Sequence, residues 1–423
     1  MKILVLNCGS SSLKFQLIET DEEMAREGRD RTLAKGLVED VGGTAVLHYE
    51  VEGKKPTRDT AGTFQHKTAV ERALAVLTDP KTGVLPHKDE IGAVGHRVVH
   101  GGERFQTSVL IDEDVIDGIE ECIALAPLHN PANLQGYHAA RALLPDAPQV
   151  AVFDTSFHQT MPPEAYLYAL PYADYQRYGI RRFGFHGTSH RFVSGRAAAL
   201  LGRANDDPAL RLITCHLGNG CSVCAIHGGK SVDTSMGFTP LEGLVMGTRC
   251  GDLDPAALLY LMGREALDAA EASAVMNKHS GLLGLSGLSH DMRTLLEAEA
   301  KGNERAKLAV DVFCYRLRKY IAAYVGALGG LDALVFAGGI GENAPLVRKR
   351  ALHGLDALGL TLDPARNERA QGAEAEISLE ELPEGLPGRL GARIFVIPTN
   401  EELLIARDAF GIVRSPARAG LPR

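Results

Sequence analysis

Hydrophobic and polar positions at the start of the chain follow a strand pattern. Residues 3–6 form a continuous apolar run typical of a buried strand, and residues 13–17 alternate between apolar and polar side chains, as a half-buried strand does. The small and polar residues 9–12 between them are typical of a turn. We therefore predict a hairpin over this first part of the chain.

A second unit of the same construction occurs in mid-chain. Residues 212–216 and 222–226 are predicted strands, and the Gly-Asn-Gly sequence of residues 218–220 is the turn that joins them. Two similar hairpins, far apart in one chain, indicate a duplicated domain in which each half contributes one loop.

The rest of the chain mixes helices with strands, which favours an α/β fold. Ala and Leu recur with helical spacing over 252–329, and residues 373–390 are acidic and contain Pro and Gly, as a surface excursion does. The other predicted elements are a helix over 133–144, a strand over 333–337 that runs into a glycine turn at 338–343, a strand over 394–397, a helix from about Thr399, and a frayed end over 414–423.

Composition narrows the class of protein. The chain of 423 residues exceeds a single typical core, so two domains are expected. A net charge of −8 does not indicate the excess of positive charge that binds nucleic acid or an anionic membrane. No apolar run is long enough to span a bilayer. The seven scattered cysteines suit reduced thiols in a cytoplasmic protein. We interpret Cys221 and Cys224, the one CxxC pair, as small buried side chains, with a redox dithiol as the alternative.

Three segments of small residues follow predicted strands, at 7–12, 216–220 and 338–343. Backbone N–H groups in such turns are accessible and bind phosphate oxygens. Because three of these segments occur in one chain, we predict a nucleotide site.

Two other glycine motifs offer alternatives to that prediction. Residues 228–231 have the tail of a P-loop, but Cys224 stands where the motif requires its first glycine. Residues 339–344 fit the GxGxxA pattern of dinucleotide-binding oxidoreductases, but they lie late in the chain without a clean βαβ unit after them. An ATP site is therefore favoured over a dinucleotide site.

Arginine and histidine side chains also lie among glycines. Arg97 follows a short predicted strand over 91–94, and its guanidinium can pair with a carboxylate or phosphate through two N–H groups. Arg249 precedes a helix that Asp252 or Asp254 is expected to cap, and it could be the positive clamp of phosphoryl transfer. His186 could donate to a developing negative charge, with a purely structural histidine as the alternative.

Acidic and hydroxyl side chains offer further candidates. Asp154 follows a predicted strand, and the carboxyl ends of strands often carry site residues in α/β sheets, although a turn or cap residue is the alternative. Ser156 and His158 are conceivable as a nucleophile pair, but no GxSxG motif supports one. Arg181 and Arg182 are interpreted as solvated.

These segments, in this order, resemble the acetate kinase family from residue 1 to about residue 410. Residues 7–15 resemble the first signature of that family, and residues 179–190 resemble its second signature. The other similar blocks are GHRVVHGG, PLHNP, FDTSFH, HLGNG, MGTRCGDLDP, GGIGEN and TNEEL. The chain departs from the family over 21–60, 361–392 and the C-terminal tail, where no site motif falls.

The resemblance implies the duplicated actin-like ATPase fold, which is the acetate and sugar kinase/Hsp70/actin fold: α/β, with two domains and ATP in a central cleft. Residues 1–152 plus 399–423 would be an N-terminal domain with a closing C-terminal helix. Residues 153–398 would be the C-terminal nucleotide-binding and dimerisation domain. The resemblance further implies a homodimer that uses Mg²⁺, or Mn²⁺, with ATP or ADP.

Site residues are carried over by motif position. The implied catalytic residues are Arg97, His129, Asp154, His186 and Arg249. The implied walls of the substrate pocket, beside Arg97, are Val99, Leu128, Phe185 and Pro240. The implied nucleotide contacts are Ser10, Ser12, Lys14, His216, Leu217, Gly218, Asn219, Gly220, Asp291, Met292, Arg293, Gly339, Ile340, Gly341, Glu342 and Asn343, and the implied Mg²⁺ ligands are Asn7 and Glu401.

The implied reaction transfers the γ-phosphoryl of ATP reversibly to acetate. Because ordinary carboxyl groups have pKa values of roughly 4 to 5, the nucleophile is already ionised at neutral pH and needs no general base. Asp154, the acid/base residue of the family, is therefore interpreted as an organiser of Mg²⁺-bound water or of Arg97. Direct in-line transfer is expected, without a phosphoenzyme. A propionate kinase and a non-enzymatic actin-like or Hsp70-like ATP-binding protein are the alternatives.

Overall fold

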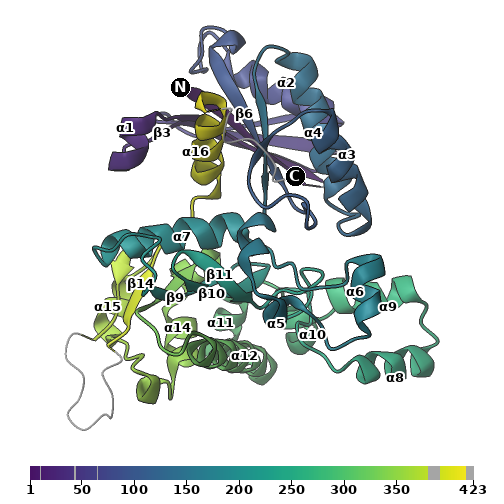
Figure 1. Ribbon diagram of the computed structural model, residues 1–423, viewed down its shortest axis with the longest axis vertical. Helices are drawn as coiled ribbons and strands as arrows, with labels where there is room; N and C mark the ends of the chain where they lie inside the picture. The colour runs from purple at the N-terminus through teal and green to yellow at the C-terminus, as the bar shows by residue number, and fades with distance from the viewer. Residues whose placement is uncertain (10, 42–43, 64, 380–390, 416–423) are drawn as a thin grey trace. The chain divides into compact units, whose positions relative to one another are not determined.

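The computed structural model describes residues 1–9, 11–41, 44–63, 65–379 and 391–415 (Figure 1). Of the predicted site residues, Ser10 alone lies outside the described residues. Most of the predicted surface excursion and of the predicted frayed end lie outside them too.

The chain divides into two compact units. Unit 1 consists of Met1–Phe157 and Asn400–Arg423, and unit 2 of His158–Thr399. The predicted domain boundaries, the dimerisation role of the second domain and the central cleft stay predictions.

Unit 1 is built on an eight-stranded sheet with the order β5-β4-β3-β2-β1-β6-β8-β7. Its strands are β1 (Lys2–Cys8), β2 (Ser12–Glu19), β3 (Arg31–Glu39), β4 (Thr44–Val51), β5 (Thr57–Thr63), β6 (Ile91–Val98), β7 (Val109–Leu110) and β8 (Gln149–Phe153). Its helices are α1 (Glu22–Glu27), α2 (His66–Leu77), α3 (Glu113–Glu121), α4 (Asn130–Leu143) and α16 (Glu401–Arg414).

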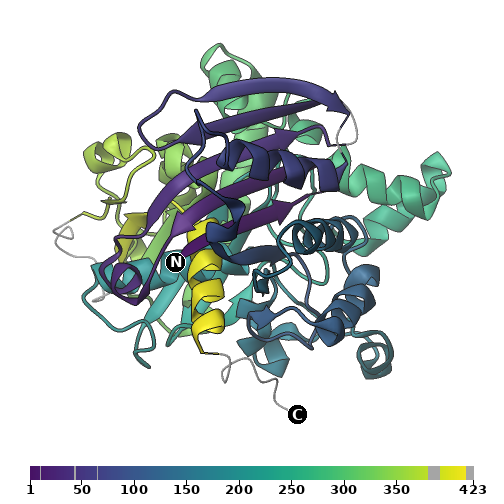
Figure 2. The ribbon, with the colours of Figure 1, turned by 90° about the horizontal axis from the view of Figure 1, so that it is seen from above.

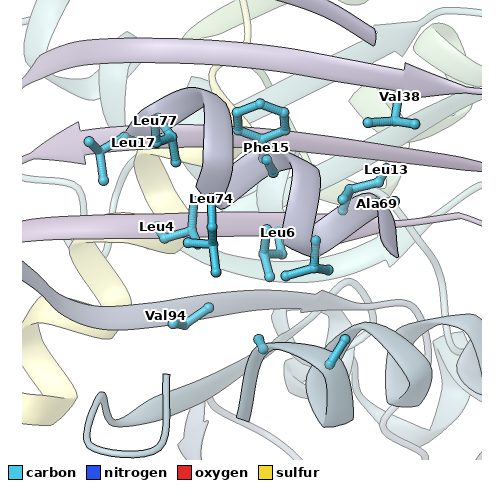
Figure 3. Packing of buried hydrophobic residues seen from close by; sticks show 14 of the residues in the cluster. Leu4, Leu6, Leu13, Phe15, Leu17, Val38, Ala69, Leu74, Leu77 and Val94 are labelled. Atoms are coloured by element: carbon cyan, nitrogen blue, oxygen red, sulfur yellow. The ribbon is translucent and has the colours of Figure 1, made fainter. Parts of the chain in front are cut away.

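The period-two pattern of β1 places apolar side chains on both faces of this sheet. Leu4 and Leu6 belong to a buried cluster with residues of α2 and α4 (Figure 3). Ile3 and Val5, one position out of phase, pack with α16 on the other face. Figure 2 shows α16, in yellow, beside the first strands of the chain, in purple. Burial on both faces makes β1 a rigid central strand whose C-terminal end can hold a site residue firmly.

Unit 2 is built on a six-stranded sheet with the order β11-β10-β9-β12-β14-β13. Its strands are β9 (Arg211–Leu217), β10 (Cys221–His227), β11 (Lys230–Thr234), β12 (Ala333–Ala337), β13 (Ala375–Glu376) and β14 (Arg393–Val396). Its helices are α5 (Pro163–Tyr166), α6 (Tyr172–Tyr178), α7 (Gly187–Leu200), α8 (Pro255–Glu265), α9 (Ala269–Lys278), α10 (Gly281–Ser286), α11 (Met292–Ala300), α12 (Glu304–Leu328), α13 (Gly338–Asn343), α14 (Pro345–Leu352) and α15 (Pro364–Arg369).

The two sheets repeat one topology, which confirms the duplication predicted from the two hairpins. In unit 1, β1 pairs antiparallel with β2 and parallel with β6, and β6 pairs parallel with β8. In unit 2, β9 pairs antiparallel with β10 and parallel with β12, and β12 pairs parallel with β14. A short antiparallel strand, β7 or β13, follows at the same edge of each sheet.

The structure corrects three of the predicted elements. Residues 338–343 form helix α13 rather than a turn. The strand predicted to end before Gly95 continues to Val98, so Arg97 lies on β6 and not in the loop after it. The helix predicted from residue 133 begins at Asn130, because Pro131 occupies its first turn, where a missing N–H is tolerated.

Candidate active site

Arg97 is the centre of a polar cluster at the ends of the central strands of unit 1. Its Nε donates to Oδ1 of Asp154 at 3.0 Å, and its Nη2 donates to Oδ2 of the same carboxylate. Its Nη1 donates to Oδ1 of Asn7 at 3.2 Å, and Oε2 of Glu401 lies 3.7 Å from its Nε. The structure therefore brings together four of the predicted site residues from β1, β6, the end of β8 and the start of α16.

Opposing effects act on the Arg97 guanidinium. Burial alone would lower its pKa, but the carboxylates of Asp154 and Glu401 outweigh that effect and raise the pKa above the ordinary value. Burial, followed by the charge of Glu401, raises the pKa of neighbouring Glu402. The cluster is thus a permanently charged cation held among acidic side chains.

Other predicted residues of unit 1 lie around this cluster. Lys14 on β2 is the cross-strand partner of Asn7 on β1. Ser12 begins β2, and its carbonyl accepts from N–H of Gly9 at 2.8 Å, which closes the first turn. Glu401 is the first residue of α16, whose N-cap is Asn400, as the predicted helix start implied.

Two buried asparagines of α4, which the sequence analysis did not single out, fix the strand ends near Arg97. Asn133 accepts from N–H of Val99 at 3.1 Å and donates to the carbonyl of Cys8 at 2.7 Å. Asn130 accepts from N–H of His100 at 3.2 Å and donates to its carbonyl at 3.0 Å. The available signal was a pair of asparagines at i and i+3 in the first turns of a helix, with one face buried.

The apolar residues predicted to wall the substrate pocket differ in exposure. In unit 1, Val99 is 8% exposed and Leu128 is 67% exposed, and His129 is the N-cap residue of α4. In unit 2, Phe185 is 3% exposed. Pro240 accepts a hydrogen bond from Nη1 of Arg249 at 3.1 Å through its carbonyl.

In unit 2 the second hairpin turn and helix α13 lie against one another. The turn is closed by a bond from N–H of Gly218 to the carbonyl of Gly220 at 3.0 Å. Gly338, at φ +74°, begins α13 so near to β9 that a Cβ there would lie 2.8 Å from the carbonyl oxygen of Leu217. Only glycine suits that position, and the contact brings two of the predicted nucleotide segments together.

The position that a side chain on Gly220 would occupy, here called the space above Gly220, is bordered by the two predicted phosphoryl-binding side chains. A Cβ placed on Gly220 would lie 3.4 Å from both Nη1 of Arg249 and Nε2 of His186. The carbonyl of Asn219 accepts from N–H of Gly247 at 2.9 Å, which ties this turn to the Arg249 loop. Cationic and imidazole nitrogens thus converge beside a glycine turn, an arrangement suited to an anion.

Two arginines expected to be solvated are structural. The side chain of Arg182 is 16% exposed and donates to the carbonyls of Thr234, Ser235 and Met236 and to the carboxylate of Glu242. Arg181 is 4% exposed, and the central carbon of its guanidinium lies 3.6 Å from the centre of the Tyr166 ring. The prediction failed because charge alone does not show when a guanidinium satisfies several carbonyls.

Two further residues predicted to contact the nucleotide, Glu342 and Asn343, form hydrogen bonds within unit 2. Oε1 of Glu342 accepts from N–H of Gly338 at 2.8 Å and from N–H of Thr399 at 3.2 Å. The Nδ2 of Asn343 donates to the carbonyl of Gly339 at 3.0 Å.

Residues 291–293, also predicted to contact the nucleotide, lie at the start of α11. Asp291 is the N-cap of α11, Met292 is buried, and Arg293 is exposed. No hydrogen bond among the described residues joins these three to the turn at 216–220.

Comparison with known proteins identifies the family. A model of the acetokinase family matches residues 2–407. The chain belongs to the acetokinase family. It is 54% identical over 417 residues to an acetate kinase of Treponema denticola, and the alignment covers 98% of this chain and 100% of that protein.

Solved structures of the family share the fold of this chain. The crystal structure of Porphyromonas gingivalis acetate kinase matches with a TM-score of 0.90 and 47% identity, covering 97% of this chain and 99% of that one. A propionate kinase from Francisella tularensis matches with a TM-score of 0.86 and 42% identity, covering 97% and 99%. This member of the acetokinase family is therefore a kinase with the duplicated actin-like ATPase fold, as the motifs predicted.

The oxygen atoms around Arg97 suit the divalent metal ion that a kinase uses. Asn7 and Glu401 supply an amide and a carboxylate oxygen, the hard ligands that Mg²⁺ prefers. Across the described ranges, no group of three or more His, Cys, Asp and Glu side chains is arranged to hold a metal ion. Because Mg²⁺ commonly binds through one or two protein oxygens together with substrate phosphates and water, this donor set fits it.

Other sequence-based interpretations can now be assessed. Cys221 and Cys224 are fully buried on β10, and burial raises the pKa of the Cys221 thiol to about 12, so the interpretation as buried side chains is confirmed. Asp254, rather than Asp252, caps α8 by accepting from N–H of Ala256. None of the helices in the described part of the chain has the length and apolar character needed to cross a membrane.

Proposed function

We propose that this chain is an ATP:acetate phosphotransferase, which reversibly forms acetyl phosphate and ADP. Membership of the acetokinase family supports phosphoryl transfer to a carboxylate. The observation that carries the proposal for this chain is the hydrogen bonding of the Arg97 guanidinium. It donates to Asp154 and Asn7 and still has N–H groups that bond to none of the described residues.

Counting hydrogens shows what Arg97 can still bind. A guanidinium has five N–H donors, of which two lie on each Nη. Asp154 takes the Nε hydrogen and one from Nη2, and Asn7 takes one from Nη1. One N–H therefore remains on each Nη, and two such donors match the two oxygens of a carboxylate. Acetate is the smallest carboxylate with an apolar substituent that such a pair of donors could hold.

The donors for the transferred phosphoryl group belong to unit 2. His186 and Arg249 border the space above Gly220, and the turn that contains Gly220 offers backbone N–H groups. We infer that the γ-phosphoryl lies in this space and that the other phosphates and the nucleoside extend along 216–220 and α13. That Arg97 and this space face one cleft is part of the proposal.

Acetate needs no proton removed, so alignment and charge neutralisation carry the catalysis. One carboxylate oxygen attacks phosphorus in line with the bond to the β-phosphate oxygen of ATP. The new O–P bond forms as the old one breaks, and the bonding electron pair leaves with ADP. Asp154, 1% exposed and bonded to Arg97 at two points, holds the guanidinium in the orientation that acetate requires.

A divalent cation completes the charge balance. Asp154, Glu401 and Glu402 surround one guanidinium, with Lys14 nearby, so the cluster carries excess negative charge that would repel both substrates. We propose that Asn7 and Glu401 hold Mg²⁺, or Mn²⁺, directly or through water. When bound, the ion would neutralise phosphate charge.

Propionate is the second candidate substrate, because a propionate kinase has the same fold at 42% identity. A hydrophobic pocket discriminates by only about 1–3 kcal/mol per methylene, so the walls from Val99, Leu128, Phe185 and Pro240 set a preference rather than an absolute choice. A non-enzymatic ATP-binding protein of this fold would not need the unused donors of Arg97.

A homodimer is also proposed, through exposed apolar side chains of unit 2 on α8 and α12. Leu259 and Tyr260 are each 67% exposed, Tyr315 is 59% exposed and Leu308 is 55% exposed. Large exposed apolar groups are typical of protein contact surfaces. The seven free thiols are consistent with a reducing compartment such as the cytoplasm.

Hydroxylamine trapping tests the proposed activity. The purified chain is incubated with ATP, Mg²⁺ and acetate, propionate or butyrate, and the acyl phosphate is captured as its hydroxamate. We expect ATP-dependent hydroxamate with the highest kcat/KM for acetate. A higher kcat/KM for propionate would assign the second candidate. ATP binding without hydroxamate from any of the acids would contradict the proposal.

A further inference from the structure

A line of hydrogen bonds runs through the interior of unit 2 and ends at His186. Oγ1 of Thr214, on β9, lies 2.7 Å from Nδ1 of His190. Nε2 of His190, on α7, lies 2.8 Å from Oγ of Ser222 on β10. The same Oγ lies 2.9 Å from Nδ1 of His186. Thr214, His190 and Ser222 are all fully buried, so these three groups form their hydrogen bonds within the protein rather than with solvent.

The direction of the line follows from the number of hydrogens available, since each hydroxyl carries one. Oγ1 of Thr214 makes no second hydrogen bond to any described residue. If His190 donated to Thr214, the threonine hydrogen would be buried without an acceptor, at a cost of about 1–3 kcal/mol. Thr214 therefore donates to Nδ1 of His190.

The next two bonds are then determined. Burial, followed by the charges of His158 and His216, lowers the pKa of His190 well below its ordinary value, so its ring is neutral and has one N–H. With Nδ1 as the acceptor, that hydrogen is on Nε2 and is donated to Ser222. The Ser222 hydroxyl then donates its own hydrogen to Nδ1 of His186.

His186 receives a hydrogen bond at Nδ1 and so carries its own hydrogen on Nε2. A doubly protonated His186 would donate at Nδ1 and leave the buried Ser222 hydrogen without an acceptor. Two features fix where Nε2 lies. His186 adopts φ +57° as the N-cap residue of α7, and its Nε2 borders the space above Gly220 together with Nη1 of Arg249.

We propose that Thr214, His190 and Ser222 are positioning residues that hold His186 as a neutral imidazole with its hydrogen on Nε2, the ring nitrogen that borders the space above Gly220. That this N–H serves the transferred phosphoryl group rests on the proposed function, whereas the hydrogen positions do not. A neutral donor can stabilise charge that develops on the phosphoryl oxygens without attracting the ground state as strongly as a cation would.

Neutron diffraction from crystals of the deuterium-exchanged full chain tests the hydrogen positions directly. We expect deuterium on Nε2 but not on Nδ1 of His186, and deuterium on Oγ of Ser222 directed at His186. Deuterium on Nδ1 of His186, alone or together with Nε2, would overturn the proposal. Because no turnover is required, this result stands or fails separately from the acetate kinase activity.

Steady-state kinetics supply a second test, with a matched control in the same sheet. Ser222→Ala removes the hydroxyl that donates to His186, and we expect kcat to fall by roughly 3- to 10-fold, the worth of one hydrogen bond, with KM for ATP nearly unchanged. Ser231→Ala removes another fully buried serine hydroxyl, which lies 2.8 Å from Nδ1 of His158 and outside the line. It should retain kcat. Equal losses in both variants, or an unchanged kcat in Ser222→Ala, would overturn the proposal.

Discussion

Arg97 and Asp154 are joined by two hydrogen bonds, in which the carboxylate is 1% exposed and the guanidinium keeps one N–H on each terminal nitrogen that bonds to none of the described residues. The pair joins β6 to the end of β8, two neighbouring parallel strands. A side chain at the carboxyl end of one strand thereby orients a charged side chain on the next, and the first prediction follows from that dependence.

Replacing Asp154 by Asn tests whether this residue orients Arg97 or moves a proton. Asn replaces one of the two acceptor oxygens by an NH2 group, which cannot accept the second guanidinium hydrogen, so we expect kcat/KM for acetate to fall by about 100-fold or more. Because acetate is ionised above its pKa, the loss should be the same factor across neutral and alkaline pH and should accompany a lower affinity for Mg²⁺. Recovery of activity only as pH rises past the pKa of acetic acid would instead support a protonation role.

The control for that variant is Asp254→Asn. Asp254 caps α8, and Asn caps helices about as well as Asp, so the same charge is lost without loss of structure. Its activity and thermal stability should match those of the wild type.

Arg249→Ala should lower kcat by roughly 100- to 1,000-fold, as loss of a donor to a developing charge commonly does. KM for ATP should change much less, because in the proposed complex backbone groups of 216–220 also hold the nucleotide. The matched variant Arg264→Ala removes an arginine of α8 that lies over Tyr260, and it should leave kcat unchanged. An Arg249→Ala enzyme that keeps most of its kcat would contradict the assigned role.

The sequence predicted the secondary structure best where the pattern is local. Strand β12 was predicted with its observed bounds, because its five apolar residues are buried on both faces. Helix α13 was predicted as a turn because two of its first residues are glycines, and it is stabilised by the distant contact between Glu342 and Thr399.

Individual site residues were predicted from motifs, whereas the groups that position them were not. The Ser222 hydroxyl lies in an apolar strand, and its partners come from α7, which is distant in the sequence. A polar residue on a buried strand signals that some partner exists but not which one. Asn133 was missed for the same reason, since its two partners lie on other elements of unit 1.

Gly220→Ala should occupy the space between Arg249 and His186. The added Cβ would lie 3.4 Å from a nitrogen of each, and no positive φ strains the new residue. We therefore expect stability close to that of the wild type and a fall in kcat of about 10-fold or more, because a phosphoryl group no longer fits between its donors. The control is Gly263→Ala on α8, where a Cβ meets nothing within 4 Å and activity should not change. Full activity of Gly220→Ala would exclude this space as the phosphoryl site.

Asn133→Ala should destabilise unit 1 by roughly 2–4 kcal/mol, because it leaves the N–H of Val99 and the carbonyl of Cys8 buried without their partner. Urea unfolding monitored by circular dichroism measures the change. Asn277→Ala, which removes exposed bonds to Ser273, should cost far less. Equal losses in the two variants would show that the buried asparagine does not fix the strand ends.

Acid should destabilise the fold through histidines that are buried in the neutral form. Burial lowers the pKa of His96 to about 4, although its hydrogen bond to Gln149 opposes the shift. The unfolded chain has the ordinary value of about 6.5 and binds the proton first as pH falls, so stability is complete above that pKa and is lost towards pH 4. Between pH 7 and pH 5 this one residue should cost roughly 2 kcal/mol. In His96→Gln, which keeps a donor to Gln149, urea unfolding at the two pH values should show a difference smaller by that amount. An unchanged difference would mean that His96 is protonated in the folded chain.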